Sequence, residues 1–144
     1  MIIAISDLAA VAGGEIIRPR SDAGGERRDG RGPDVVRGAS IDSRSLTHGE
    51  LFVAVPAERD GHDYVAAAAR LGAAAALVSR PVDADIVQIV VDDTVAALGA
   101  MGALARERLE GPVVGITGSV GKTSTKDLLA SICALAGVTT ASAK

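Results

Sequence analysis

The sequence Gly115-Ile116-Thr117-Gly118-Ser119-Val120-Gly121-Lys122-Thr123-Ser124 decides how this chain is interpreted. Just before and within it, Val113, Val114 and Ile116 are apolar and β-branched, which predicts a buried parallel strand. From Thr123 onward the apolar residues follow helical spacing instead, and the stretch therefore lies between a strand and a helix, where a phosphate-binding loop is expected. The expected apolar face of that helix comprises Leu128, Leu129, Ile132 and Leu135.

The residue types in this loop suit nucleotide phosphate binding. Glycines at 118 and 121 let consecutive backbone N–H groups point toward phosphate oxygens, and the helix N-terminus adds a favourable dipole. Lys122 can reach the terminal phosphates, and the Thr123 hydroxyl can bind Mg²⁺. Position 116 is Ile where the general pattern has glycine, so this is the shorter Thr-Gly-x-x-Gly-Lys-Thr version. The alternative interpretation is a glycine-rich turn that binds nothing.

Length and composition limit the remaining interpretations. The 144 residues are enough for one ordinary domain, or for a small domain and part of another. Apolar residues make up 48% of the chain, but few of them are aromatic. This composition predicts a thin core packed by alanine and valine. A net charge of −3 gives no reason to expect nucleic-acid or membrane binding. The single cysteine, Cys133, suits a reducing compartment, and with no targeting segment in view we expect a cytoplasmic protein.

The rest of the chain predicts strands that alternate with helices, and hence an α/β fold with a partly parallel sheet. The expected strands cover residues 2–5, 15–17, 51–55, 75–79 and 86–91, and a strand-like segment covers 138–142. The expected helices cover residues 6–11 with Ser6 as the cap, 64–71, and the segment from a cap at Asp92 or Asp93 to about 108.

Two further features concern domain organisation. Residues 18–37 contain Arg, Gly, Asp and Pro with almost nothing apolar, which predicts a flexible surface loop. Gly111-Pro112 is typical of a domain boundary. We therefore expect one domain over residues 1–110 and the start of a second over 111–144.

Two polar segments remain ambiguous by their own chemistry. Asp42-Ser43-Arg44 follows an expected strand end, where an Asp–Arg pair can contact a ligand but more often only fixes a loop. Asp60, His62 and Asp63 precede the helix expected at Tyr64, and a helix cap is the interpretation that we favour for them.

Taken together, four stretches resemble the Mur ligase family of bacterial cell-wall synthesis. Their order and spacing fit the family, and the likeness covers nearly the whole chain apart from residues 18–37. The stretches are Asp42-Ser43-Arg44, Gly49-Glu50-Leu51-Phe52-Val53-Ala54, Asp60-Gly61-His62-Asp63-Tyr64 and Ile116-Thr117-Gly118-Ser119-Val120-Gly121-Lys122-Thr123-Ser124.

The resemblance implies a UDP-binding N-terminal domain, followed by the first strand, loop and helix of a P-loop ATPase domain. It implies that UDP lies near Ile41, Asp42, Ser43, Arg44, Ala57, Glu58 and Arg59. It implies that ATP contacts Thr117, Gly118, Ser119, Val120, Gly121, Lys122, Thr123 and Ser124. Within this set, Lys122 and Thr123 are expected to be catalytic, with Thr123 as the Mg²⁺ ligand. The turn at residues 57–59 is about one residue shorter than the family pattern, which leaves its individual contacts open.

The implied reaction is ATP-dependent amide formation through an acyl phosphate. Ser124 favours the branch of the family that adds D-alanyl-D-alanine to UDP-N-acetylmuramoyl-tripeptide, and the sister branch that adds diaminopimelate or lysine is the nearest alternative. We expect a monomer that binds no nucleic acid and does not insert stably into a membrane. Because one strand and one helix of the ATPase sheet precede Lys144, we also expect an N-terminal piece that does not catalyse ligation alone.

Two other hypotheses belong to different classes. One is a non-catalytic UDP-sugar-binding module whose loop at 117–123 is vestigial. The other is a complete small P-loop NTPase, against which the lack of a second acidic motif after the loop argues. Binding of UDP-sugar without a response to ATP favours the first, and ATP binding without UDP dependence favours the second.

Overall fold

The structure is a computed structural model that describes residues 2–19 and 35–142. The chain divides into two compact units, a first unit over Met1–Arg108 and a second unit over Leu109–Lys144. Each unit has its own secondary structure, and each is described by itself below.

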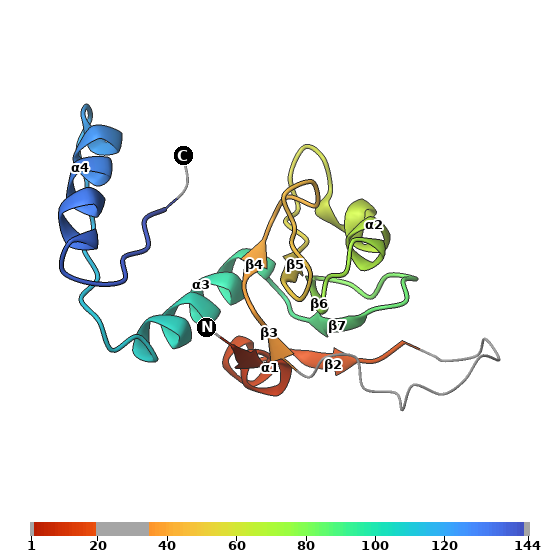
Figure 1. The fold of residues 1–144 in the computed structure, drawn as a ribbon. Coiled ribbons are helices and arrows are strands. Elements are labelled where there is room, and N and C mark those ends of the chain that lie inside the picture. Colours follow the sequence, from red (N-terminus) through yellow and green to blue (C-terminus); the bar gives the residue numbers. More distant parts are fainter. Residues whose placement is uncertain (1, 20–34, 143–144) are drawn as a thin grey trace. The chain divides into compact units, whose positions relative to one another are not determined.

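The first unit is built on a five-stranded sheet with the strand order β2-β7-β6-β5-β4 (Figure 1). Neighbours from β4 to β7 pair in parallel, and β2 pairs antiparallel with β7 at the edge. This confirms the predicted α/β class with a partly parallel sheet, and all but one of the strand pairs are parallel. The strands are β2 (Glu15–Ile17), β4 (Ala39–Ser40), β5 (Leu51–Val53), β6 (Ala75–Val78) and β7 (Val87–Val90).

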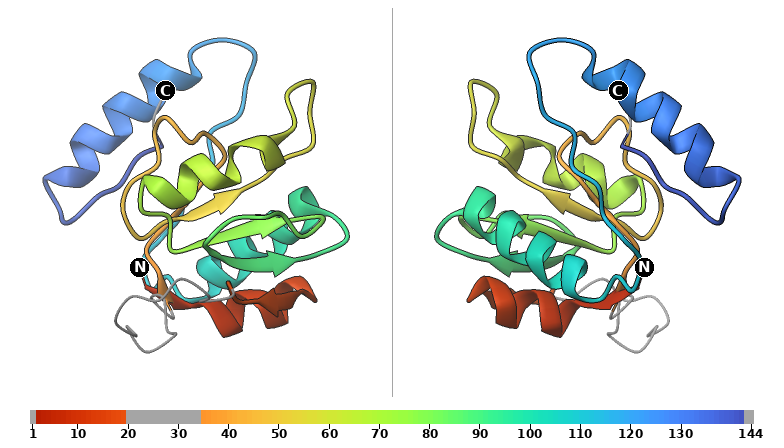
Figure 2. Two further views of the ribbon diagram at one scale, coloured as in Figure 1. Left: turned by 90° about the vertical axis from the view of Figure 1, so that its right-hand side faces the viewer. Right: turned by 90° about the vertical axis from the view of Figure 1, so that its left-hand side faces the viewer.

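Helices cover both faces of this sheet (Figure 2). One face packs against α1 (Ile5–Ala12) and α3 (Thr94–Glu107), and the other packs against α2 (Val65–Arg70), which follows the 3₁₀ helix η1 (Gly61–Tyr64). The alternation of side chains along β5 explains both cores, because Leu51 and Val53 join the first cluster and Phe52 joins the second. A strand that is covered on both faces has a continuous run of apolar residues, as β5 does.

A second, two-stranded sheet pairs β1 (Ile3–Ala4) antiparallel with β3 (Val35–Val36). This corrects part of the predicted loop at 18–37, since its last residues form a strand and Val36 is buried. The physical reason is that β1 offers backbone hydrogen bonds while Val36 packs into the core beside α1 and α3. Residues 20–34 of that predicted loop lie outside the described residues.

Helix termini in the first unit test two predicted caps. Asp93 caps α3 as expected, because its Oδ1 accepts hydrogen bonds from the backbone N–H groups of Val95 (2.8 Å) and Ala96 (3.0 Å). The predicted cap at Ser6 is wrong: α1 begins at Ile5, and its N-cap residue makes no side-chain hydrogen bond. Burial of Ile5 in the core accounts for the earlier start. The other elements match the predicted ranges within about two residues at each end, which is the usual uncertainty of helix and strand ends.

The second unit contains α4 (Lys122–Ala134), in agreement with the predicted helix. Neither predicted strand forms there, because residues 113–116 and 138–142 have no regular secondary structure. A β-strand exists only when a neighbouring strand satisfies its backbone N–H and C=O groups. No strand pairing involves the described residues 109–142, so the β-branched composition alone does not produce a strand.

Candidate functional site

The parallel strands bring several predicted site segments to one edge of the sheet. Because β4, β5 and β6 are parallel neighbours, the segments after their carboxyl ends lie side by side. Residues 41–44 follow β4, the turn at 55–60 follows β5, and Ser79 and Arg80 follow β6. Ligands commonly bind at this edge in open α/β sheets. Both predicted UDP segments therefore belong to the same edge of the first unit.

The Asp42-Ser43-Arg44 segment is a turn closed by its own side chains. Two nitrogens of the Arg44 guanidinium donate to the Asp42 carboxylate, Nε to Oδ1 at 2.9 Å and one terminal nitrogen to Oδ2 at 2.7 Å. The Arg44 backbone N–H also donates to Asp42 Oδ1 at 2.9 Å. Ser43, at the centre, is half-buried, and Ile41 is 64% exposed. The Asp–Arg pair thus fixes the turn that presents these two residues.

Charge in this turn is stabilised by the same contacts. Side-chain hydrogen bonds from Arg44, followed by its backbone N–H, lower the pKa of the Asp42 carboxyl to about 2. The hydrogen bond to Asp42 in turn raises the pKa of the Arg44 guanidinium above its usual value. Both groups are therefore ionised at neutral pH, and the turn carries no net charge of its own from this pair.

The turn after β5 presents the other predicted UDP residues: Ala57, Glu58 and Arg59. All three are exposed, and neither Glu58 nor Arg59 makes a side-chain hydrogen bond or ion pair within the described part of the chain. The turn closes where the Gly61 N–H donates to the Val55 carbonyl oxygen at 3.0 Å. Gly61 is required there, since a Cβ at this position would lie 2.6 Å from the Val55 nitrogen. The tip is accessible while its base is fixed.

A polar cluster behind this turn was only partly predicted. Asp60 caps a helix, but the helix is η1 and not the one predicted at Tyr64: its Oδ1 accepts the His62 backbone N–H at 3.0 Å, whereas α2 has no side-chain cap. The same carboxylate also contacts His62 Nδ1 at 2.6 Å and the terminal guanidinium nitrogen of Arg80 at 2.7 Å. The backbone hydrogen bond from His62, followed by the Arg80 contact, holds the pKa of Asp60 well below its usual range.

Sequence reasoning missed the partners of this cluster across the sheet. Ser79 and Arg80 are 17 and 20 positions beyond His62 and Asp60, so no local motif joins them. The signal that could have found them is topological: both sets of residues follow neighbouring parallel strands, β5 and β6, whose carboxyl ends meet.

The glycine-rich loop of the second unit contains two glycines with positive φ angles. Gly118 (φ 150°) and Gly121 (φ 82°) both adopt conformations that side-chain-bearing residues rarely take. Gly121 is the N-cap of α4, and Lys122 is its first residue. The Lys122 ammonium contacts the Gly118 carbonyl oxygen and so lies over the loop. Thr123 is exposed at the first turn of the helix.

These residues fit a nucleotide phosphate and its metal ion. The first N–H groups of a helix have no intrahelical partner, and together with the dipole they favour an anion at this end. Lys122 would neutralise phosphate charge, and the Thr123 hydroxyl would supply a hard oxygen ligand of the kind that Mg²⁺ prefers. No group of three or more His, Cys, Asp or Glu side chains that could hold a metal is present among residues 2–19 and 35–142.

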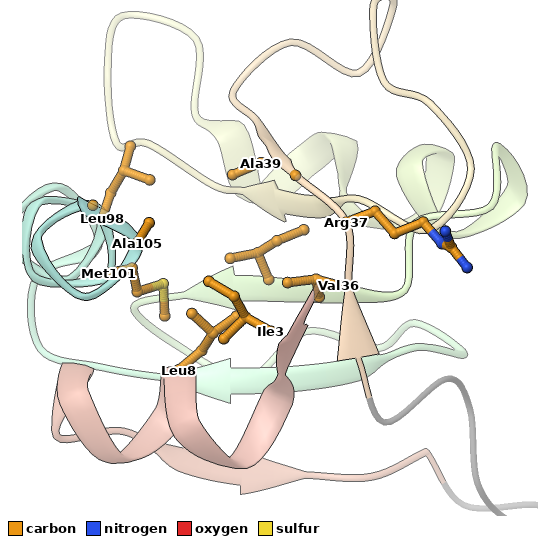
Figure 3. Close-up of a pocket in the computed structure, with 11 residues that line it drawn as sticks. Ile3, Leu8, Val36, Arg37, Ala39, Leu98, Met101 and Ala105 are labelled. Carbon is orange, nitrogen blue, oxygen red and sulfur yellow. The ribbon is translucent and has the colours of Figure 1, made fainter. Parts of the chain in front are cut away.

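Of two cavities, one lies away from the predicted contacts and the other borders them. A cavity of about 170 Å³ in the first unit lies between β1, β3, α1 and α3 and is lined by aliphatic side chains, including Leu8 and Met101 (Figure 3). No predicted site residue lines it. A cavity of about 750 Å³ in the second unit touches only Lys122 and Thr123 of the predicted nucleotide contacts, and much of its lining is apolar, such as Val113 and Leu129. Neither cavity is the phosphate loop itself.

The sequence profile described as Mur ligase family, catalytic domain, matches residues 35–107, which is just over half of the chain. The chain belongs to the Mur ligase family. The match covers β3 to the end of α3 and includes the whole sheet edge described above, whereas the loop at 115–124 lies beyond it.

Individual relatives agree with the family. UDP-N-acetylmuramoyl-tripeptide–D-alanyl-D-alanine ligase from Escherichia coli strain K12 is 45% identical over 111 residues, covering 76% of this chain and 25% of its own length. UDP-N-acetylmuramoyl-L-alanyl-D-glutamate–2,6-diaminopimelate ligase from Aquifex aeolicus is 39% identical over 107 residues, covering 71% and 22%. Both named branches of the Mur ligase family thus resemble this chain.

Solved structures of the family have a similar fold. MurF from Acinetobacter baumannii is 33% identical with a TM-score of 0.69, and the match covers 94% of this chain and 28% of that one. MurF ligase from Thermotoga maritima in complex with ADP is 36% identical with a TM-score of 0.52, covering 65% and 22%. This chain therefore spans about a quarter of the length of the Mur ligases that it matches. No helix in the described part of the chain is long and apolar enough to span a bilayer.

Proposed function

We propose that this chain supplies the UDP-binding part and the first phosphate-binding part of an ATP-dependent amide ligase. The ligase would join D-alanyl-D-alanine to UDP-N-acetylmuramoyl-tripeptide, which is a step in the synthesis of the peptidoglycan precursor. Residues 1–110 would form the UDP-binding domain, and residues 111–144 would begin the ATP-binding domain. The observation that carries the proposal is the joint occurrence of the family fold and a Gly-Lys-Thr-Ser loop at the start of α4.

The UDP half of the proposal rests on the sheet edge in the first unit. Ser43 and Ile41 are presented by a turn that Asp42 and Arg44 hold closed, and the tip at 57–59 is exposed. Arg59 would offer its charge to the diphosphate, since it has no ion pair within the described residues. The fixed turn and the accessible side chains together suit a polar, anionic ligand.

The ATP half rests on the loop from Thr117 to Ser124. Its two glycines have positive φ angles, and Lys122 contacts the Gly118 carbonyl oxygen, which supports this half of the proposal. Lys122 and Thr123 would be catalytic because they would contact the phosphoryl group that is transferred. Mg²⁺, when bound at Thr123, would neutralise phosphate charge and so make phosphoryl transfer easier.

The chemistry follows from the weakness of a carboxylate as an electrophile. Transfer of the γ-phosphoryl group of ATP to the tripeptide carboxylate gives an acyl phosphate and ADP. Attack by the amine of D-alanyl-D-alanine on the carbonyl carbon then forms the C–N bond. The C–O bond to the phosphate breaks, inorganic phosphate leaves, and the amine loses a proton. The residues of this chain would bind the UDP end and orient the phosphates, and they form no covalent bond to substrate.

The sister reaction is the second candidate function, because a diaminopimelate-adding ligase is also 39% identical to this chain. Its UDP and ATP requirements would be met by the same residues, and only the acceptor and the peptide length differ. We place the D-alanyl-D-alanine branch first, because the identity to the relative of that name is higher, at 45%. We expect the protein to act as a monomer in the cytoplasm.

Two titrations of the ¹⁵N-labelled chain test both halves. UDP should shift amide signals within residues 41–44 and 55–60, and ATP with Mg²⁺ should shift signals within 117–124. Ser43→Ala should weaken only the response to UDP, and Lys122→Ala should weaken only the response to ATP. A response to UDP without one to ATP would favour the binding module, and the reverse would favour the small NTPase.

An activity assay tests the reaction itself in the native protein that carries this sequence. Lys122→Ala should lower amide formation by at least roughly 100-fold, because charge stabilisation on the transferred group is lost. Wild-type-like turnover would refute the role of Lys122. Product formed with diaminopimelate and the dipeptide substrate, and not with D-alanyl-D-alanine and the tripeptide, would assign the sister reaction.

A further inference from the structure

His62 is a buried polar residue to which neither the predicted UDP contacts nor the phosphate loop gives a role. It is 4% exposed, and it lies at the start of η1 just beyond the turn after β5. Its Nδ1 is 2.6 Å from Asp60 Oδ1, and its Nε2 is 2.9 Å from the backbone nitrogen of Ser79. The imidazole therefore connects the turn after β5 with the carboxyl end of β6.

These contacts define where the ring carries its proton. A backbone N–H can only donate, so Nε2, which faces the Ser79 nitrogen, must accept and is unprotonated. The remaining proton of a neutral imidazole is then on Nδ1, which donates to the Asp60 carboxylate. Both ring nitrogens have a partner, and each partner belongs to a different strand connection.

Asp60 extends this linkage. Its Oδ1 serves His62, and its Oδ2 accepts from Arg80 at 2.7 Å. The exposed residues 57–59 lie between Val55, whose carbonyl accepts from Gly61, and Asp60. The turn is thus held at its base by the backbone and tied to the neighbouring strand by the imidazole and the ion pair.

We propose that His62 is a positioning residue for UDP: it holds the turn at 56–60 against the end of β6, so that residues 57–59 keep the shape that contacts the nucleotide. The proposal rests on the proposed UDP-binding role of this sheet edge. His62 itself does not contact the nucleotide, because its side chain is 1% exposed. Small displacements of a binding turn are costly, since misplacement by about 1 Å can lower function roughly 100-fold.

A hydrolytic role for the same residues does not fit the geometry. Ser79 Oγ lies 3.2 Å from His62 Nε2, and Asp60 lies on the other side of the ring, as in a nucleophile–base–acid arrangement. However, Nε2 already accepts the Ser79 N–H at the shorter distance of 2.9 Å. A ring whose lone pair is occupied and whose side chain is almost fully buried cannot take a proton during attack on a substrate.

The first test reads the tautomer in the wild-type chain. Only two histidines are present, His48 and His62, so their ring signals can be separated, and His48 is exposed and serves as the internal reference. Long-range ¹H–¹⁵N spectra should show a pyrrole-like Nδ1 and a pyridine-like Nε2 for His62. A proton on Nε2 would overturn the proposal. Because this test uses the wild-type chain, it does not depend on whether a variant folds.

The second test measures UDP affinity and folding together. His62→Ala should weaken UDP binding roughly tenfold or more and abolish the UDP-induced shifts at 55–60, while those at 41–44 remain. His62→Gln keeps an acceptor for the Ser79 N–H and should recover part of the affinity. The matched control is His48→Gln, the same substitution at the exposed histidine, which should bind as the wild type does.

The outcomes separate this proposal from the one on which it rests. If the wild type binds UDP and folded His62→Ala binds within about twofold of it, His62 only stabilises the fold and the positioning role is refuted. If His62→Ala does not fold, the comparison of His62→Gln with His48→Gln decides, and equal affinity refutes the role. If the wild type itself does not bind UDP, the proposed UDP site fails and this proposal fails with it.

Discussion

The two units of this chain differ in how their apolar residues are covered. In the first unit, Val53 and Leu77 are fully buried between helices on both faces of the sheet. In the second unit no residue of α4 is buried, and Leu128 and Ile132 are 65% and 55% exposed. Both units show clear apolar patterning in the sequence. The difference shows that patterning specifies which face is apolar, whereas burial requires another element to pack on it.

The largest expected difference is in amide hydrogen exchange. Amides of β6, which is hydrogen-bonded to strands on both sides, should exchange at least roughly 100-fold more slowly than those of α4, because opening β6 requires unfolding of the core. Exchange measured by NMR or mass spectrometry without added ligand tests this expectation. Equal protection of β6 and α4 would show that α4 is covered in solution.

A pair of leucine substitutions makes the same comparison in free energy. Leu77→Ala in the first unit should lower the free energy of unfolding by about 2–5 kcal/mol, because it leaves a cavity in a closed core. Leu128→Ala in the second unit should change it by less than about 0.5 kcal/mol. Urea unfolding followed by the fluorescence of Tyr64, the only tyrosine, reports on the first unit, and circular dichroism follows all the helices together, including α4. A loss above 1 kcal/mol for Leu128→Ala, by the same exposed-site argument, would contradict its exposure.

A pair of glycine substitutions compares backbone packing. Gly61→Ala should destabilise the first unit by roughly 1–3 kcal/mol, because the new Cβ would lie 2.6 Å from the Val55 nitrogen and 2.8 Å from the Ala54 Cα. Gly115→Ala in the second unit has no atom within 4 Å of its new Cβ and should change stability by less than about 0.5 kcal/mol. Equal thermal midpoints for the two variants would mean that the turn at 55–61 is looser than described.

The smallest expected effect concerns acid sensitivity. The pKa of Asp60 is lower in the folded state than its ordinary value of 3.8. Its contribution to the free energy of unfolding is therefore fully present above pH 3.8 and is lost as the pH falls through the pKa of the folded state. Asp60→Asn should therefore be less stable than the wild type at pH 7, and the difference in stability should shrink steadily as the pH falls below the ordinary value of 3.8. Asp127→Asn, which removes an ion pair with adjacent Lys126, is the control and should match the wild type throughout. A constant difference down to pH 2 would refute the linkage.

The sequence predicted the first unit better than the second for a physical reason. In the first unit, the apolar runs at 51–55, 75–79 and 86–91 each form a strand, because each has a parallel neighbour to pair with. Residues 113–116 show the same β-branched signal and form no strand, since strand formation is a property of a pair and not of one segment. By contrast α4, whose hydrogen bonds are internal, forms as predicted.

The candidate site divides in the same way. Local chemistry predicted a capping role for Asp60, although for the helix after η1, and backbone bends at glycines 118 and 121, because each depends on neighbours within a few residues. The contacts of His62 and Asp60 with Ser79 and Arg80 could not be predicted from spacing, since they depend on the order of strands in the sheet. The individual contacts with UDP and ATP remain predictions.

The antiparallel pairing of β2 with β7 also governs the order of events during synthesis of the chain. Glu15 pairs with Val90, so the partner of the earliest strand in the five-stranded sheet is made 75 residues later. Parallel strands β4 to β7 follow one another closely and can associate as they leave the ribosome, whereas β2 must wait for the last of them. Closing such a long loop carries an entropic cost before any contact compensates for it. The N-terminal strand is therefore expected to join the sheet late and to need β7 as its template.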